Sequence, residues 1–386
     1  MNSYLAEYKP NTAGLYIHFP YCIHKCAYCD FYSIGVGKDK EIEQEKLFQN
    51  YLAEFFARLK SNSSLSELEF ETIFIGGGTP SMANLDLLEE LISTVKKNLQ
   101  FSKNFEFSME ANPEDITKDK ISGFHQLGVN RLNVGVQSFL SKHLKTLDRF
   151  HIETKYQDLM GIISDGNISR IGIDLMYGIP DQSLEDFFAD LEKALNSKIS
   201  HISLYSLTAE KGTEYYRKIE SKKAKPPNEE IQIQILDQLP DFLNAKGFEQ
   251  YEVSNFAKNS SEFSMHNLKY WKFEKYFSIG PSAHGFLSQG RYSNKRSIEN
   301  YLQGNFSFEF EPVSLLSELA ICLLRLFCKI NFNSYQDLLG NDFQKVNLLL
   351  KKWNAQGLCE YRDGIFQWNQ KSILDLDSRI LEFSSL

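Results

Sequence analysis

Three cysteines lie within eight residues near the start of the chain, in the stretch CIHKCAYC. They are Cys22, Cys26 and Cys29. Thiolates at these spacings can converge from one loop onto a single cubane iron–sulfur cluster. Because three ligands serve four irons, one iron is left without a protein thiolate. The spacing therefore favours a [4Fe-4S] site with one position open to another ligand.

A zinc site is the alternative for the same thiolates. Structural zinc sites close their coordination with a fourth ligand, and no fourth cysteine stands nearby. His18 or His24 would have to complete such a site. Cys322 and Cys328 lie far along the chain in the apolar run LLSELAICLLRLFCKI, where free thiols behave as small hydrophobic residues. We interpret these two as core residues and not as ligands.

A glycine-rich segment, GGGTPS at residues 76–81, follows a β-rich run. Glycines there permit positive φ and let backbone groups approach a ligand closely, although a tight turn would use the same residues. Two carboxylates also belong to β-rich runs. Glu110 ends one run, where it could bind a ligand or be a solvated charge. Asp174 stands inside another, and an unpaired carboxylate is costly to bury, so it needs a partner.

Alternating strands and helices must position these groups. Apolar β-rich runs occur at residues 14–19, 71–76, 105–110, 131–136, 170–178 and 201–207. Segments with helical apolar spacing separate them, at residues 44–59, 84–98, 118–127, 154–164 and 183–196. This alternation predicts right-handed crossovers and a parallel sheet. Six units fall short of the eight of a closed barrel, so we predict an α/β fold with a partial (βα)6 TIM-like barrel. A flat doubly wound sheet is the alternative, and the sequence pattern alone does not choose between the two. In either fold the chemistry belongs at the C-terminal ends of the strands.

The pattern changes after about residue 210. The Lys-rich stretch SKKAKPPNEE is typical of a loop, and a helix is expected over residues 229–246. From residue 313 the chain is mainly helical and ends in a hairpin pattern, GLCEYRDGIFQWN. We predict a barrel over residues 1–210, a barrel extension over 211–312, and a small helical domain over 313–386 in which a winged-helix arrangement is one option.

Composition indicates a water-soluble globular protein. Hydrophobic residues make up 42% of the 386 residues, and no apolar stretch is long enough to span a membrane. The N-terminus does not have the pattern of a secretory signal, so we expect a cytoplasmic protein. A net charge of -8 gives no basic stripe for a phosphate backbone, which argues against a nucleic-acid partner.

The CxxxCxxC spacing after the first strand resembles the signature of the radical S-adenosylmethionine (SAM) superfamily, and GGGTPS resembles the motif of that family that contacts the SAM amino group. The resemblance implies a [4Fe-4S] cluster on the three cysteines and SAM bound to the open iron, where the cofactor supplies the radical chemistry. By the same matching, the implied SAM-binding residues are Tyr16, Tyr28, Gly77, Gly78, Thr79, Glu110, Gln137, Arg149 and Asp174.

Within that superfamily, the stretches YIHFPYCIHKCAYCDFYS, NVGVQSF and IDLMYGIP resemble the oxygen-independent coproporphyrinogen III oxidase group. Two features depart from the true oxidases of this group. They carry a further cysteine two residues past the third cluster ligand, where this chain has Phe31. They also have a longer N-terminal extension, whereas only 21 residues precede Cys22. Both departures put the decarboxylase activity in doubt.

The segment HNLKYW resembles the HNxxYW pattern of the HemW-type heme chaperones. His266 offers an imidazole nitrogen to heme iron, and Tyr270 and Trp271 offer flat apolar surface to a porphyrin, although such a histidine is commonly just packed. His284 is a second candidate ligand. The resemblance implies a carrier that passes heme to heme-requiring respiratory proteins.

A heme carrier of this kind would also use a one-electron donor and would contact membranes only through its acceptors. The alternative is a coproporphyrinogen III oxidase that converts propionates to vinyls by radical decarboxylation. Radical modification of RNA ranks low, because the chain has no basic patch or accessory RNA-binding module.

Overall fold

The computed structural model describes residues 4–37, 43–149, 159, 161–162, 167–312, 314–369 and 375–386. Six parallel strands form its centre, in the order in which they follow one another along the chain. They are β2 (Thr12–Phe19), β5 (Glu69–Gly77), β6 (Gln100–Ala111), β7 (Arg131–Gln137), β8 (Arg170–Tyr177) and β9 (His201–Ser206). The predicted set of six strands and their parallel arrangement are therefore confirmed.

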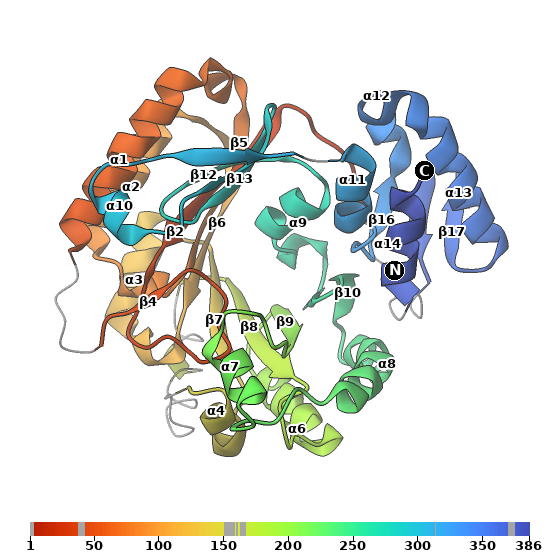
Figure 1. The fold of residues 1–386 in the computed structure, drawn as a ribbon, viewed down its shortest axis with the longest axis horizontal. Coiled ribbons are helices and arrows are strands. Elements are labelled where there is room, and N and C mark those ends of the chain that lie inside the picture. Colours follow the sequence, from red (N-terminus) through yellow and green to blue (C-terminus); the bar gives the residue numbers. More distant parts are fainter. Residues whose placement is uncertain are drawn as a thin grey trace.

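Helices cover the outer, convex face of this sheet (Figure 1). They are α1 (Gln44–Ser61), α2 (Leu85–Asn98), α3 (Lys118–Leu127), α4 (Ser141–Thr146), α6 (Leu184–Leu195) and α8 (Glu229–Ala245), while the short α7 (Glu214–Glu220) follows β9. The side chains of Asn84, Thr117 and Ser183 accept hydrogen bonds from the first backbone N–H groups of α2, α3 and α6, which fixes where these helices begin. The helix expected over residues 154–164 lies largely outside the described residues.

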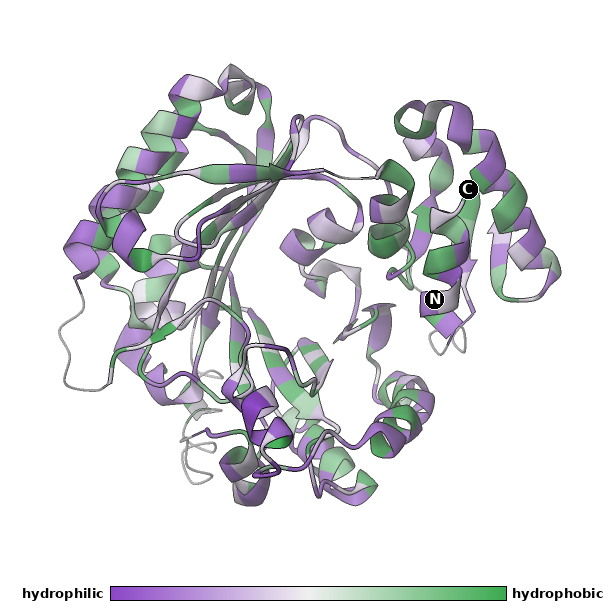
Figure 2. Cartoon of the chain, viewed as in Figure 1, coloured by the Kyte–Doolittle hydropathy of each residue, from purple (hydrophilic) through white to green (hydrophobic). Residues whose placement is uncertain are grey.

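The two faces of the sheet differ in chemistry because successive side chains of a strand point to opposite faces. On β8, Ile171, Ile173 and Leu175 belong to the main hydrophobic core under the outer helices. Gly172 and Asp174 alternate with these three residues and therefore lie on the inner face of the sheet. Hydrophobic residues alternate with hydrophilic ones along the strands and outer helices (Figure 2). The inner face is therefore free to carry polar groups.

The sheet continues on both sides of the six central strands, which the sequence did not predict. At one side β12 (Lys275–Ile279) runs parallel to β2, and β13 (His284–Leu287), β14 (Gly290–Asn294) and β15 (Phe308–Glu311) follow as antiparallel strands, with α10 (Ile298–Leu302) between the last two. At the other side β11 (Asn255–Ala257) pairs with β9, and β10 (Glu249–Glu252) pairs with β11. Twelve strands of the described residues thus share one sheet.

Helix α9 (Met265–Trp271) lies on the inner face of this sheet, opposite the outer helices (Figure 1). It packs against β2, β5, β6 and β12.

The predicted domain boundaries near residues 210 and 312 stay a prediction.

The C-terminal region has a hydrophobic core largely of its own. It contains α11 (Leu315–Leu323), α12 (Gln336–Leu339), α13 (Phe343–Ala355) and α14 (Leu376–Ser384), and the predicted hairpin is present as β17 (Cys359–Arg362) and β18 (Ile365–Trp368). Near the N-terminus, β1 (Leu5–Ala6) adds to this small sheet by pairing with β16 (Lys329–Asn331). Cys322 and Cys328 are buried free thiols, as predicted.

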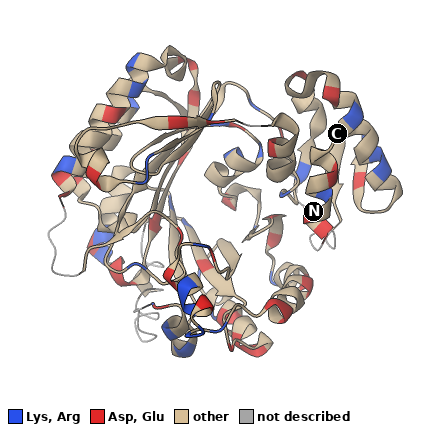
Figure 3. Cartoon of the chain, in the orientation of Figure 1, with Lys and Arg blue, Asp and Glu red and all other residues tan. Residues whose placement is uncertain are grey.

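Positive and negative side chains are interspersed over the outer helices, and the strands carry few of them (Figure 3). In the part of the chain that the structure describes, no helix combines the length and the apolar character needed to cross a membrane.

Candidate functional site

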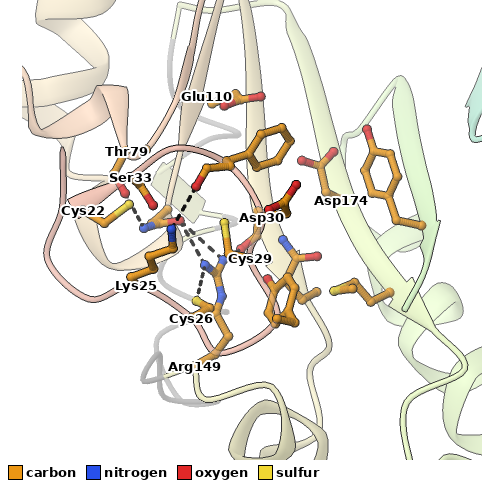
Figure 4. A pocket seen from close by; sticks show the side chains of 18 of the residues that line it. Cys22, Lys25, Cys26, Cys29, Asp30, Ser33, Thr79, Glu110, Arg149 and Asp174 are labelled. Carbon is orange, nitrogen blue, oxygen red and sulfur yellow. Dashed lines mark hydrogen bonds between the residues drawn. The ribbon is translucent and has the colours of Figure 1, made fainter. Parts of the chain in front are cut away.

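A cavity of about 430 Å³ opens at the C-terminal ends of the central strands (Figure 4). This is where a parallel barrel places its chemistry. Eleven of the residues selected from the sequence line it: Cys22, Cys26, Cys29, Tyr28, Gly77, Gly78, Thr79, Glu110, Gln137, Arg149 and Asp174. The fold therefore gathers into one pocket residues that are spread over more than a hundred positions of the chain.

The three cysteines lie on a loop that is closed by a short parallel pair, β3 (Tyr21–Cys22) and β4 (Ile34–Gly35). The backbone N–H of Cys29 donates to the carbonyl oxygen of Cys26 at 3.1 Å, which folds the loop back on itself. Cys22 and Cys26 are buried, and Cys29 is half-buried. Burial raises the pKa of Cys22, and it raises the pKa of Cys29 to about 11. A cationic metal centre is the partner that would favour the thiolate form at this site.

Hydrogen-bond donors surround the thiols. Nη1 of Arg149 lies 3.6 Å from Sγ of Cys26. The hydroxyls of Thr79 and Ser33 act on Cys22 and oppose the rise of its pKa that burial causes. In Figure 4 both hydroxyl residues lie beside Cys22. Ser33 was not selected from the sequence, because a single serine in a loop carries no spacing signal.

The glycines of the GGGTPS segment are needed for close packing. Gly77 has φ of 110°, and a Cβ on it would lie 2.5 Å from the ring of His18. A Cβ on Gly78 would lie 2.4 Å from the carbonyl oxygen of Tyr21 on the cluster loop. The Gly77 N–H donates to Oε2 of Glu110 at 3.1 Å. The segment therefore joins the cluster loop to Glu110 across the first three central strands.

Glu110 and Asp174 place two carboxyl groups in the same pocket. Burial, and then the neighbouring Asp174, raise the pKa of Glu110 to about 8. Burial also raises the pKa of Asp174 to about 6. Oδ1 of Asp174 has no hydrogen-bond partner among the described residues. A ligand group that is cationic or donates hydrogen bonds would satisfy both carboxylates.

The residues fit a cluster with a bound ligand better than a zinc ion. Within the described ranges, no three His, Cys, Asp or Glu side chains converge closely enough to hold a single metal ion. Both ring nitrogens of His18 are in hydrogen bonds, to the hydroxyl of Tyr16 (3.0 Å) and the carbonyl of Tyr32 (2.7 Å), and Nε2 of His24 bonds Asp148 (3.0 Å). Among the described residues that line the pocket, Asn133 Oδ1, Arg149 Nε and Asp174 Oδ1 are buried side-chain atoms without a hydrogen-bond partner. Such atoms indicate a site that a ligand completes.

Two further pocket residues are Gln137, whose backbone is strained, and Asn112, whose side chain connects Thr79 with Arg149. Gln137 has φ of 68°, at an irregularity in the pairing of β7 with β8. Backbone strain of this kind in a non-glycine residue is common at binding sites. Asn112, which follows the predicted Glu110 closely, bridges the pocket because its Nδ2 donates to Oγ1 of Thr79 at 3.1 Å, while Arg149 approaches its Oδ1 at 3.4 Å. The MEANP stretch could have indicated Asn112.

Tyr16 does not line the pocket. Its ring lies deeper on the inner face, between His18 and the ring of His266, at centroid distances of 6.0 and 6.4 Å. Its predicted contact with SAM stays a prediction.

The HNxxYW segment forms α9 and is also separate from the pocket. His266 is fully buried: its Nδ1 lies 2.7 Å from the hydroxyl oxygen of Thr72, and its Nε2 lies 2.8 Å from that of Tyr270. Burial lowers the pKa of His266 to about 3, so the imidazole is neutral. Trp271 packs under the guanidinium of Arg325, whose carbon lies 4.8 Å from the ring centroid. Neither ring nitrogen of His266 is open to iron in this conformation.

The fold and this pocket define a class of protein. The family model described as the Radical SAM superfamily matches residues 16–194. The fold resembles that of the coproporphyrinogen III oxidase HemN from Escherichia coli, described as a radical SAM enzyme, with a TM-score of 0.78 over 98% of this chain and 92% of that chain. The sequence identity to HemN is 20%, so this likeness concerns the fold. The architecture is that of a radical SAM protein.

Sequence relatives identify the family within the radical SAM superfamily. The heme chaperone HemW of Buchnera aphidicola subsp. Acyrthosiphon pisum is 37% identical over 321 residues, which cover 81% of this chain and 82% of that protein. The heme chaperone HemW of Escherichia coli is 34% identical over 299 residues, 76% of each chain. The chain belongs to the HemW family of the radical SAM superfamily, as the motifs predicted.

Proposed function

We propose that the protein is a heme chaperone that binds heme and delivers it to heme-requiring, respiratory proteins of the cytoplasm or its membrane. The observation that carries this proposal is the 37% identity to a heme chaperone over most of both chains. Phe31 supports the chaperone function over the oxidase function. This residue lines the pocket and is 66% exposed, at the position where the oxidase pattern calls for a cysteine.

In this proposal Cys22, Cys26 and Cys29 hold a [4Fe-4S] cluster, and the cluster with bound SAM supplies one-electron chemistry when a donor reduces it. The protein's own residues bind and orient the ligand. Glu110 and Asp174 offer carboxylates to its cationic groups, and the Gly77–Gly78 backbone lets it approach β5 closely. Arg149 approaches Cys26 and Asn112 from the opposite wall, where it can receive a carboxylate.

For heme, His266 stays the proposed ligand, with Tyr270 and Trp271 as its porphyrin contacts. The buried position of His266 adds a requirement to this proposal, because the ring has to be released before it can bind iron. Heme ligation through Nε2 has to break the 2.8 Å hydrogen bond to Tyr270 and move α9 or the His266 ring out of its buried place. His284 is the alternative ligand that needs no such movement, because its side chain is 64% exposed on β13.

The two histidines can be separated by heme titration of the anaerobically reconstituted protein. His266→Ala is expected to abolish most of the bound-heme absorption band while leaving iron and sulfide of the cluster unchanged. The matched variant His284→Ala is expected to keep the band. The reverse result would assign the ligand to His284, and loss in neither variant would remove both from the proposal.

The runner-up function is radical decarboxylation of coproporphyrinogen III, favoured by the HemN-like fold. Anaerobic incubation of the reconstituted protein with coproporphyrinogen III, SAM and a reductant separates the two functions. The chaperone proposal predicts no protoporphyrinogen. Its formation with multiple turnovers would overturn the proposal that the protein acts only as a carrier.

A further inference from the structure

Three partnerless polar atoms belong to the central strands β6, β7 and β9, and one of them is on a residue that lines the pocket. They are Ser108 Oγ, Asn133 Oδ1 and His201 Nδ1, none of which has a hydrogen-bond partner in the described ranges of the chain. The exposed fractions of these residues are 0%, 6% and 0%. Buried polar groups in native proteins are almost always paired with protein or with ordered water. Ordered water is therefore the expected partner of these polar atoms.

Gly172 lies between Asn133 and His201 in the sheet. In the sheet register, Gly172 pairs with Asn133 on one side and with His201 on the other. A Cβ on Gly172 would lie 3.1 Å from Asn133 Oδ1 and 3.1 Å from His201 Nδ1. Both atoms thus lie beside the Cβ position of Gly172, and they are separated by no more than twice that distance. Two hydrogen bonds through one oxygen atom span such a gap.

We propose that an ordered water molecule occupies the space over Gly172 and hydrogen-bonds both Asn133 and His201. Water suits this place because it donates and accepts. Burial and the nearby Arg131 hold the pKa of His201 well below its usual value, so the ring is neutral and Nδ1 is a donor in one tautomer and an acceptor in the other. A water molecule pairs with either tautomer and with either orientation of the Asn133 amide. An amide and one imidazole nitrogen offer too few ligands for a metal ion.

The water would complete a hydrogen-bonded path from the pocket to α9. Asn133 lines the pocket. Beyond the water, His201 Nε2 lies 2.8 Å from the hydroxyl oxygen of Tyr251, which accepts from the backbone N–H of Ser264 at 3.1 Å. Ser264 caps the N-terminus of α9. The water thereby connects Asn133, which lines the pocket, to the N-terminus of α9.

A crystal structure of the full chain at a resolution that shows ordered water tests the proposal directly. Electron density within hydrogen-bond distance of both Asn133 and His201, over the Cα of Gly172, is the expected result. A direct hydrogen bond between the two side chains, or an empty space, would overturn the proposal. Neither outcome bears on the heme function, which the histidine titration tests separately.

Two substitutions at Gly172 give a second test. Gly172→Ala excludes the water and leaves both polar atoms unpaired, so the melting temperature should fall. Gly172→Ser is bulkier, but its hydroxyl can take over the hydrogen bonds of the water, so its melting temperature should lie above that of Gly172→Ala. Steric crowding alone predicts the opposite order, and that order would contradict the proposal. Gly161→Ala, whose Cβ would meet open space on an exposed helical residue, is the control and should not lower the melting temperature.

Discussion

Nε2 of His266 lies 2.8 Å from the hydroxyl oxygen of Tyr270, one turn later on the same helix. Both residues belong to the segment proposed to bind heme, yet here they bind each other on the inner face of the sheet. The rings also pack edge to face, with centroids 5.0 Å apart. The contact therefore occupies Nε2 of His266, and any use of this atom as a heme ligand competes with it.

Tyr270→Phe tests this competition. Removal of the hydroxyl frees Nε2 of His266 without removing the aromatic surface, so heme should bind several-fold more tightly or faster, as measured by titration of the heme absorption band. Tyr276→Phe is the matched control, because Tyr276 is also buried on the inner face but its hydroxyl accepts from Arg291. Weaker binding by Tyr270→Phe alone would show that the hydroxyl contacts heme or its ligand and does not compete with heme for Nε2 of His266.

Glu110 should make SAM binding depend on pH. Its pKa of about 8 means that the carboxyl is largely protonated at neutral pH, and only the ionised form attracts the sulfonium and ammonium groups of SAM. Affinity measured by calorimetry should therefore rise from pH 6.5 to pH 9, roughly tenfold for one full charge interaction. In Glu110→Gln the affinity should be lower and the rise much smaller. An equal rise in both proteins would assign the pH dependence to another group.

The same carboxyl affects stability with the opposite trend. Between its usual pKa of 4.5 and about 8, Glu110 binds a proton in the folded state that it lacks in the unfolded state. The free energy of unfolding of the ligand-free protein should consequently decrease as pH rises through this window. Glu110→Gln should remove that part of the decrease, which urea denaturation at pH 6 and pH 8.5 would measure.

Ser33→Ala should shift the midpoint potential of the cluster to a more negative value, because a hydrogen bond to a thiolate sulfur stabilises the reduced, more negative cluster. The measurement is a redox titration followed by electron paramagnetic resonance, with iron and sulfide content unchanged. Ser206→Ala lies at the β9 side of the same pocket and is the control. An unchanged potential in Ser33→Ala would show that the hydroxyl does not interact with the cluster.

Glu106 anchors α9 to the sheet. Its carboxylate accepts from the backbone N–H groups of Met265 (3.2 Å) and His266 (3.1 Å) and from Nε of the fully buried Arg131 (2.9 Å). Glu106→Ala leaves that cation unpaired and should lower the free energy of unfolding by about 3–5 kcal/mol. Glu192→Ala, which removes an exposed pair with Lys246, should cost at most about 1 kcal/mol in the same urea experiment. Similar losses in the two variants would show that Glu106 has no anchoring role.

Local pattern predicted the six central strands, because each is a run whose apolar residues pack under the outer helices. Most of the pocket residues were predicted from the resemblance to the radical SAM superfamily, and the rule that residues at the C-terminal ends of parallel strands meet placed them in one site. The edge strands β10 to β15 escaped prediction because they are short and their pairing depends on contacts distant in sequence, as between Tyr276 and Gly14. For the same reason, the place of His266 inside the barrel could not be read from its spacing to Tyr270, which fits an exposed helix equally well.

The proposed site is a cluster held by three thiolates with one iron open to SAM. It is tested most directly by metal analysis and electron paramagnetic resonance of the anaerobically reconstituted protein, reduced with and without SAM. We predict about four irons and four sulfides per chain, a reduced-cluster signal that changes when SAM is added, and loss of the cluster in Cys26→Ala. Stoichiometric zinc at the three cysteines, or a cluster signal indifferent to SAM, would contradict the account.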